Sequence, residues 1–222
     1  MSKTETNKTE SKSGIPEGLE LNKVKKWVKG RVSAKRFKHI KGVVEVGARL
    51  ANSCGEDPFP VELSCWLHDS CKEIKAEELL RMAEGFGLEI TEAERRNGHL
   101  LHGPVGACVS GKEFGITSHD VLSGISEHTL GSAKMTRVSK LVYLADILEA
   151  SRPEALTSPI WQALCSGKQL EEKGLEPDLD AAILTASDLV LSHLIEKGKF
   201  IHPKAVAVRN HFLEVVTGRK ST

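Results

Sequence analysis

The chain has 222 residues, of which 40% are hydrophobic and 27% charged, and its 31 Lys and Arg residues nearly balance 30 Asp and Glu residues. This length predicts one compact domain, and a net charge of +1 excludes the strong field that would hold a protein on nucleic acid or an anionic bilayer. We therefore expect no nucleic-acid partner and no membrane partner. The longest apolar run, residues 141–145, is far shorter than the roughly 20 residues that span a bilayer.

The cysteines and the N-terminus indicate the compartment and the domain boundary. The five cysteines are an odd number and show no C-x-x-C spacing, which favours reduced thiols in the cytoplasm over a disulfide framework. Apart from Met1, residues 1–14 are all polar or Gly, so they offer nothing to bury. The sequence predicts a disordered polar tail over residues 1–18 and a single folded domain over residues 19–217.

Beyond the tail, apolar residues recur at helical spacing and no segment alternates over the length of a strand, so the predicted fold is all-α. His39 shares a helix face with apolar residues four, seven and eleven positions later, and therefore points inward. A second helix, over residues 61–71, carries His68 and Asp69 near its end. His102 lies beside the apolar stripe of a third predicted helix.

Two further predicted helices carry polar residues, and a pair of helices follows them. His128 shares a face with Val121 and Ile125, and Asp146 follows Val142 by one helical turn. A C-terminal helix pair is expected over residues 179–194 and 206–216. Segments rich in Gly and Pro are expected to be loops, around residues 85–98, 151–159 and 166–178.

Six of these side chains are imidazoles or carboxylates on or beside apolar faces, where an unpaired polar group costs several kcal/mol. A bound metal ion would compensate for that cost. The candidate ligands are His39, His68, Asp69, His102, His128 and Asp146. Because the set contains no thiolate, it favours iron, manganese or zinc at an open, catalytic position over a closed structural zinc site.

Cations recur close to the candidate ligands. Arg36 precedes His39 by three residues, Lys72 follows Asp69 by three, and Arg152 lies six residues beyond Asp146. Thr129, next to His128, adds a hydroxyl. Guanidinium and ammonium groups beside a metal meet the needs of phosphoester or phosphoanhydride hydrolysis, because together they neutralise phosphoryl oxygens.

The residues occur in an ordered series of motifs that covers roughly residues 31 to 155. The series is Arg36-Phe37-Lys38-His39; Trp66-Leu67-His68-Asp69 with Lys72; Leu101-His102-Gly103-Pro104-Val105-Gly106-Ala107; His128-Thr129-Leu130-Gly131 with Met135; and Tyr143-Leu144-Ala145-Asp146 leading to Glu149 and Arg152. In this series the chain resembles the HD-domain phosphohydrolases, and within them the YqeK family of symmetrical dinucleoside tetraphosphate hydrolases.

The resemblance implies an HD-domain helical bundle, with C-terminal helices packed on it, that holds iron and cleaves diadenosine tetraphosphate into two ADP. One or two ions are expected, and manganese or another divalent metal is an alternative. His39, His68, Asp69 and Asp146 match the core metal ligands. His102 and His128 match histidines that either complete a second metal site or contact the phosphates. The implied substrate-binding set is Arg36, Lys72, His102, His128, Thr129, Asp146 and Arg152.

These residues suggest a mechanism in which a metal ion lowers the pKa of water, so that hydroxide attacks an inner phosphorus in line. Asp69 and Lys72 are the predicted catalytic residues: Asp69 would bridge two ions or orient the water, and Lys72 would offset phosphate charge. The leaving group, ADP, needs little help from an acid.

Two alternatives share these residues. One is an HD-type nucleotidase acting on mononucleotides, and the other is a non-catalytic metal- and nucleotide-binding sensor or assembly module. The sequence leaves the oligomeric state open, with a homodimer as one alternative. Histidines outside the motif series, His202 among them, are interpreted as structural. The segment from Phe200 to Phe212 is also similar to the family, and the resemblance implies that the part near His202 and Pro203 can close over the base of a nucleotide.

Overall fold

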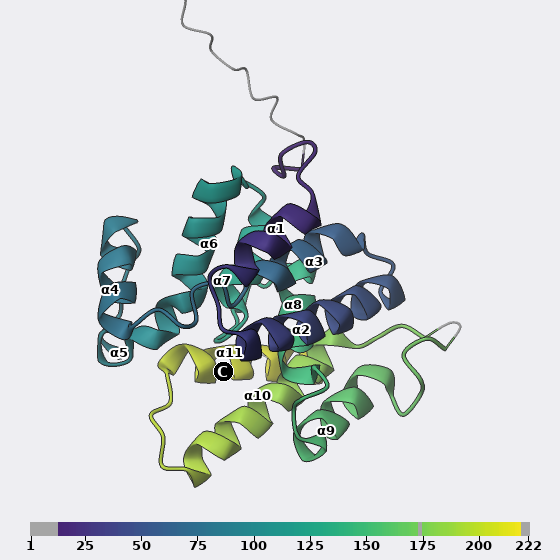
Figure 1. Cartoon of the computed structure of the whole chain (residues 1–222). Coiled ribbons are helices and arrows are strands. Elements are labelled where there is room, and N and C mark those ends of the chain that lie inside the picture. The colour runs from purple at the N-terminus through teal and green to yellow at the C-terminus, as the bar shows by residue number, and fades with distance from the viewer. Residues whose placement is uncertain (1–12, 173–174, 219–222) are drawn as a thin grey trace, which may run out of the picture.

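The computed structural model describes residues 13–172 and 175–218, which form eleven α-helices, one short 3₁₀ helix and no strand (Figure 1). The prediction of an all-α fold is confirmed. The elements are α1 (Leu21–Lys29), α2 (Ala34–Ser53), α3 (Pro58–Leu67), α4 (Ala76–Gly85), α5 (Glu92–Arg96), η1 (Gly98–Leu101), α6 (His102–Phe114), α7 (His119–Glu127), α8 (Arg137–Leu148), α9 (Glu154–Cys165), α10 (Leu179–Glu196) and α11 (Pro203–Thr217).

Four helices form the centre of the molecule. Helix α2 packs against α3 and α8, while α7 packs against α3, α6 and α8. Their inward faces carry fully buried aliphatic side chains such as Ile40, Leu63, Ile125 and Leu144. Burial of each such side chain stabilises the fold by roughly 1.5–3 kcal/mol, so these faces fix how the four helices meet.

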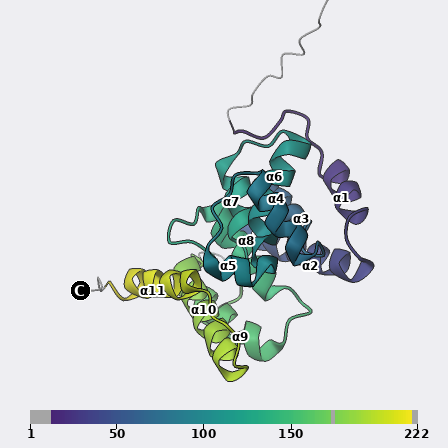
Figure 2. The ribbon, with the colours of Figure 1, turned by 90° about the vertical axis from the view of Figure 1, so that its left-hand side faces the viewer.

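The remaining helices pack around this centre. Helix α10 packs against α8, α9 and α11, and both ribbon views place α10 and α11 on the side of the centre that faces away from α1 (Figures 1 and 2). Helices α4 and α6 with η1 enclose a second, smaller apolar cluster, which includes Leu79, Leu101 and Val105. This cluster anchors the segment that leads into His102.

Sharp chain reversals set the ends of the central helices. Gly131 has φ of +69°, a left-handed conformation that suits glycine, and its N–H donates to the carbonyl of Glu127 at 2.7 Å. Helix α7 therefore ends abruptly just before His128. At the start of α8, the Thr136 hydroxyl accepts the N–H of Ser139, an N-cap that stabilises the helix end by about 1 kcal/mol.

The structure shortens the expected disordered tail. The carbonyl of Gly14 accepts the N–H groups of Thr117 and Ser118 at 2.7 and 2.8 Å, and Ile15 is 8% exposed. Ordered contacts therefore begin before the predicted boundary at residue 18, because Ile15 is an apolar side chain that the core can bury. The rest of the expected tail, residues 1–12, lies outside the described residues.

Two of the expected loops contain helices. Residues 151–159 include the start of α9, and residues 85–98 include α5, where Thr91 and Glu94 form a capping box. The expected loop over residues 166–178 forms no helix in the part that the structure describes. None of the described helices has the length and apolar character needed to cross a membrane.

Candidate metal centre

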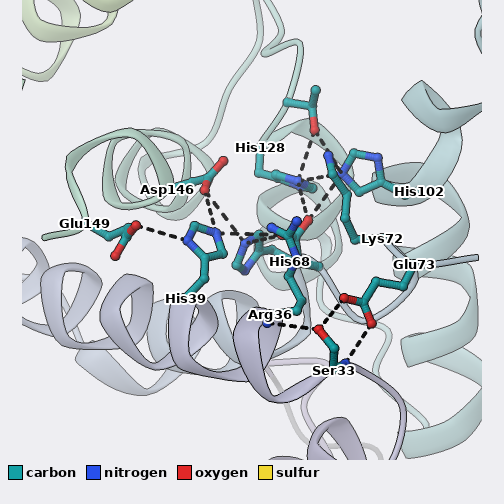
Figure 3. A network of polar contacts seen from close by, with 12 residues as sticks. Ser33, Arg36, His39, His68, Lys72, Glu73, His102, His128, Asp146 and Glu149 are labelled. Atoms are coloured by element: carbon teal, nitrogen blue, oxygen red, sulfur yellow. Dashed lines mark hydrogen bonds and ion pairs between the residues drawn. The ribbon is translucent and has the colours of Figure 1, made fainter. Parts of the chain in front are cut away.

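The fold brings the six candidate ligands into one cluster (Figure 3). His39 lies in α2 and Asp146 in α8, His68 and Asp69 follow the end of α3, His102 begins α6, and His128 follows the end of α7. The cluster contains two groups of three residues, and within each group the ligand atoms lie within 4.8 Å of one another. The first is His39, His68 and Asp146, and the second is His68, Asp69 and His128.

The Asp69 carboxylate lies between the histidines and faces them with different oxygens. Its Oδ2 lies 3.5 Å from His68 Nε2 and 3.7 Å from His39 Nε2. Its Oδ1 lies 3.4 Å from His102 Nε2 and 3.5 Å from His128 Nε2. The side chain is only 4% exposed. One carboxylate therefore joins both halves of the cluster.

A close approach of two helices positions His102 and His128. A Cβ on Gly103 would lie 2.9 Å from the carbonyl oxygen of Ser126 and 3.3 Å from His128 Cε1, so a larger residue would push the start of α6 away. With glycine at this position, the Nε2 atoms of His102 and His128 lie 3.0 Å apart.

Three imidazoles are fixed in the same way. In His68, His102 and His128, Nδ1–H donates to the carbonyl of the residue three positions earlier. A carbonyl can only accept, so Nδ1 carries the proton of the neutral ring and Nε2 presents a lone pair to the centre of the cluster. Metal-binding histidines are oriented by this kind of outer hydrogen bond.

The fourth imidazole, His39, is oriented by a carboxylate that the sequence analysis quoted in a motif but gave no role. Glu149 Oε1 lies 3.2 Å from His39 Nδ1, and Glu149 is 3% exposed. The N–H and hydroxyl of Ser151 donate to this carboxylate. At Gly42 a Cβ would lie 2.8 Å from Glu149 Oε2, so the glycine makes room for it. The sequence signal that could have indicated this role is the position of Glu149, about one helical turn after the candidate ligand Asp146.

Replacing Glu149 with Gln is expected to lower metal affinity about 10- to 100-fold, because the imidazole of His39 loses its anionic partner. Metal titration of the variant measures the effect. Glu154→Gln, at the exposed start of α9, is the matched control and should bind metal like the unmodified chain. Equal metal affinity in both variants would contradict the assigned role.

The cluster leaves buried polar atoms unsatisfied. His39 Nε2, His68 Nε2 and Asp69 Oδ1 are shielded from solvent and have no hydrogen-bond partner, although Asp146 Oδ1 lies 3.0 Å from His39 Nε2. Buried polar groups in proteins are nearly always satisfied. Converging nitrogen lone pairs and carboxylate oxygens fit a divalent cation with N and O ligands, so the residues present suit a metal ion.

The cations form the rim of the cluster, as the sequence spacing predicts. Arg36 Nη1 lies 2.7 Å from Asp69 Oδ2, and Arg152 Nη2 lies 2.7 Å from Asp146 Oδ1. Lys72 Nζ donates to His102 Nε2 at 3.1 Å. Arg36 and Arg152 are partly exposed, so their guanidinium groups are accessible to an anion that approaches the cluster.

A polar clamp holds Arg36 in this position (Figure 3). The N–H and hydroxyl of Ser33 donate to the Glu73 carboxylate at 2.7 and 2.6 Å, and the Ser33 hydroxyl oxygen caps α2 by accepting the N–H of Arg36 at 3.2 Å. The clamp ties the start of α2 to the segment after α3. It therefore fixes the helix turn that carries Arg36 relative to Asp69.

Protonation in the cluster follows from burial and from neighbouring charge. Burial disfavours the charged Asp69 carboxylate, but the neighbouring His68 holds its pKa well below the usual range. Burial likewise disfavours a charged Lys72 and lowers its pKa, although Asp69 partly opposes this. Burial also lowers the pKa of His102 to about 4, which keeps this ring neutral near pH 7.

The protein-family model of the HD domain matches residues 36–151 of the sequence, which is more than half of the chain and includes all six clustered residues. The chain belongs to the HD domain family. The matched segment covers α2 to α8, the helices whose packing forms the cluster. Members of this family hold a divalent metal, and the imidazole and carboxylate cluster described above is consistent with one.

Several relatives extend the similarity beyond the matched domain. Two proteins named symmetrical bis(5'-nucleosyl)-tetraphosphatase are similar over most of the chain. The one from Staphylococcus aureus is 27% identical over 87% of this chain and 95% of its own length, and the one from Halalkalibacterium halodurans is 28% identical over 88% and 98%. A crystal structure from Clostridium acetobutylicum, described as a predicted HD superfamily hydrolase involved in NAD metabolism, has a TM-score of 0.79 at 28% identity. It covers 89% of this chain and 98% of that one.

Proposed function

We propose that the protein is a metal-dependent hydrolase that cleaves diadenosine tetraphosphate, and related dinucleoside polyphosphates, symmetrically into two ADP. The observation that carries this proposal is the buried imidazole and carboxylate cluster with Arg36, Lys72 and Arg152 at its rim. Relatives that align over almost their whole length and are named symmetrical bis(5'-nucleosyl)-tetraphosphatase support the choice of substrate.

In this proposal His39, His68, Asp69 and Asp146 hold a divalent metal. The metal supplies Lewis-acid chemistry and lowers the pKa of water, so that a nucleophile is available near neutral pH. Iron is the proposed metal, with manganese as an alternative, because N and O donors without thiolate suit both. Asp69 Oδ1 faces His102 and His128, so these three residues would hold a second ion if one binds. Without a second ion, His102 and His128 would contact the phosphates.

The chain's own side chains bind and orient the phosphates. Arg36 and Arg152 offer paired N–H donors to the phosphate oxygens, and Lys72 offers a point charge. Asp69, buried and ionised, orients the attacking water toward an inner phosphorus. Thr129 Oγ1, 3.0 Å from His128 Nε2, adds a hydroxyl at the same edge. The departing ADP is a stabilised anion, so this scheme assigns no general acid.

Product analysis tests the proposal. The protein, reconstituted with ferrous iron without oxygen, is incubated with diadenosine tetraphosphate, and ADP is expected as the only nucleotide product. ATP with AMP would contradict symmetrical cleavage. Turnover of mononucleotides alone would favour the nucleotidase, and tight nucleotide binding without turnover, with several metals, would favour the sensor module.

We also infer that the protein works in the cytoplasm. All five cysteines are free, and burial raises the pKa of the Cys65 and Cys71 thiols, so both stay protonated and unreactive. Free, buried thiols are typical of a reducing compartment. The homodimer remains a prediction, as does the absence of a nucleic-acid partner.

A further inference from the structure

The charge of the chain is unevenly distributed, although its sum is close to zero. Residues 21–44 contain nine Lys and Arg residues and no Asp or Glu, whereas the other 198 residues contain 22 Lys and Arg and 30 Asp and Glu. The segment therefore carries a formal charge of +9 and the rest of the chain a formal charge of −8. It comprises α1 and the first half of α2, the helix that carries His39. A strong local field therefore coexists with the small net charge.

Eight of the nine cations are exposed, and we call these eight the basic collar. They are Lys23, Lys25, Lys26, Lys29, Arg31, Lys35, Lys38 and Lys41. Within the described residues, none of the eight forms an ion pair with a carboxylate, whereas Arg49, Lys140 and Arg209 each have a carboxylate partner. Unpaired cations on one surface repel one another and do not stabilise the fold, so the collar is better explained by an anion that it attracts.

On α2 the collar continues directly into the metal cluster. Figure 3 shows Arg36 and His39 pointing from the first turns of α2 to the cluster, and the same turns carry Lys35, Lys38 and Lys41. Neighbouring positions on one helix surface lie about 5–6 Å apart, which is less than the Debye length of about 8 Å at physiological salt. The field of these lysines therefore reaches an anion that approaches the cluster.

Helix α1 brings further cations to the segment that carries Lys72. The helix packs against α3, and Lys25 Nζ lies 5.7 Å from the centre of the Trp66 ring in the last turn of α3. Arg31, between α1 and α2, interacts with the side chain of Cys71, one residue before Lys72. The collar therefore borders the segment after α3, which holds two of the candidate ligands, from α1 as well as from α2.

Carboxylates around the collar are fewer than its cations. They are Glu17 and Glu20 before α1, Glu45 in α2, Glu62 one turn before Trp66 on α3, and Glu73 after α3. Glu73 lies closest to the middle of the collar, because it accepts the N–H and hydroxyl of Ser33 between α1 and α2. Eight exposed cations against five carboxylates leave the surface positive.

We propose that the basic collar steers the polyphosphate chain of the substrate to the metal cluster, and that it raises the association rate without holding the bound substrate. The inference rests on the proposed function, which supplies a substrate with several negative charges on a short chain. Surfaces of one sign of charge beside a site raise association rates by about 10- to 1000-fold. The negative charge on the rest of the chain adds to this effect, because it disfavours encounters away from the site.

The test measures how fast fluorescently labelled ADP associates with the metal-loaded protein in stopped-flow experiments at several salt concentrations. Lys29→Glu with Lys38→Glu reverses two exposed charges of the collar. Its association rate constant is expected to be about tenfold lower at low salt, and the difference should disappear at high salt, where ions screen the field. Arg81→Glu with Lys197→Glu, on the exposed surface of α4 and at the end of α10, changes the net charge equally and is the matched control. It should associate like the unmodified chain.

A second collar variant, Lys35→Gln with Lys41→Gln, removes two charges without reversing them and keeps residues with similar helix propensity. It is expected to lower the association rate constant in the same direction, by about two- to threefold. The dissociation rate constant of ADP should be unchanged in both collar variants. Unchanged association in both variants, or a loss of affinity that comes from faster dissociation, would overturn the inference.

A single-stranded RNA oligonucleotide serves as the last probe, because a basic surface can also bind nucleic acid. We expect no binding at physiological salt, and tight binding that Lys29→Glu with Lys38→Glu abolishes would assign the collar to nucleic acid and overturn the inference. Failure of the unmodified protein to release ADP from diadenosine tetraphosphate would instead overturn the proposed function, and the association rates of ADP would still decide the role of the collar.

Discussion

Replacing Asp69 with Asn is expected to abolish hydrolysis of diadenosine tetraphosphate, with a loss of about 10³-fold or more. Asn has nearly the same shape but no charge, so the change removes the carboxylate that faces both halves of the cluster. Metal assistance lowers the activation barrier by several kcal/mol, and each 1.36 kcal/mol changes a rate about tenfold. Initial rates at saturating substrate measure the loss.

Two further measurements make this result specific. Bound metal, measured by elemental analysis, is expected to fall in Asp69→Asn, while circular dichroism should show an unchanged helical content. Asp120→Asn, an exposed carboxylate in the first turn of α7, is the matched control and should keep full activity. A fully active Asp69→Asn protein would remove Asp69 from the mechanism and leave the assignment of the site without its central residue.

Adding manganese or ferrous iron to the metal-free protein is expected to raise its melting temperature by about 5–10 °C. A ligand at 100 times its Kd stabilises the folded state by about 2.7 kcal/mol, and 1 kcal/mol shifts Tm by about 2–4 °C in a chain of this size. The effect should be large because the metal would link α2, α3 and α8, which are distant in sequence. Thermal scans with and without metal measure it, and a chelator should reverse it.

Two single-histidine variants separate this site from adventitious binding. His39→Ala removes a ligand of the first group and should lose most of the shift. His193→Ala removes an exposed histidine of α10 and should keep it. The same shift in both variants would mean that the metal binds elsewhere.

The sequence predicted the central helices well because their apolar stripes are regular. The stripe after His39 and the one before Asp146 determine which side of α2 and α8 faces the core, and the structure buries those sides. The helix predicted over residues 61–71 ends earlier, at Leu67, so His68 and Asp69 lie just after α3 and not inside it. The inward direction of His68 and His128 was still predictable, since each continues an apolar face at the end of its helix. Spacing along one helix was therefore enough to indicate which polar residues point inward.

Features that depend on contacts between distant segments were not predictable. Helix α9 contains Pro159 and follows Pro153, so its composition favoured a loop, yet Ile160 and Leu164 bury against the core and stabilise the helix. Glu149 can orient His39 only because α2 lies close to the Glu149 carboxylate, and this close approach requires a glycine at position 42. The anchoring of Gly14 depends on the loop before α7.

The unsatisfied atoms at the centre of the cluster place selection for activity in conflict with selection for stability. Each buried polar group without a partner costs about 1–3 kcal/mol, a large share of the 5–15 kcal/mol that holds a typical domain folded. His68 is fully buried, so without metal an apolar side chain of similar volume there would stabilise the core while ending catalysis. A lineage that lost the need for the reaction would be free to replace these residues, and the same four-helix core would then evolve toward a more stable protein without a metal site.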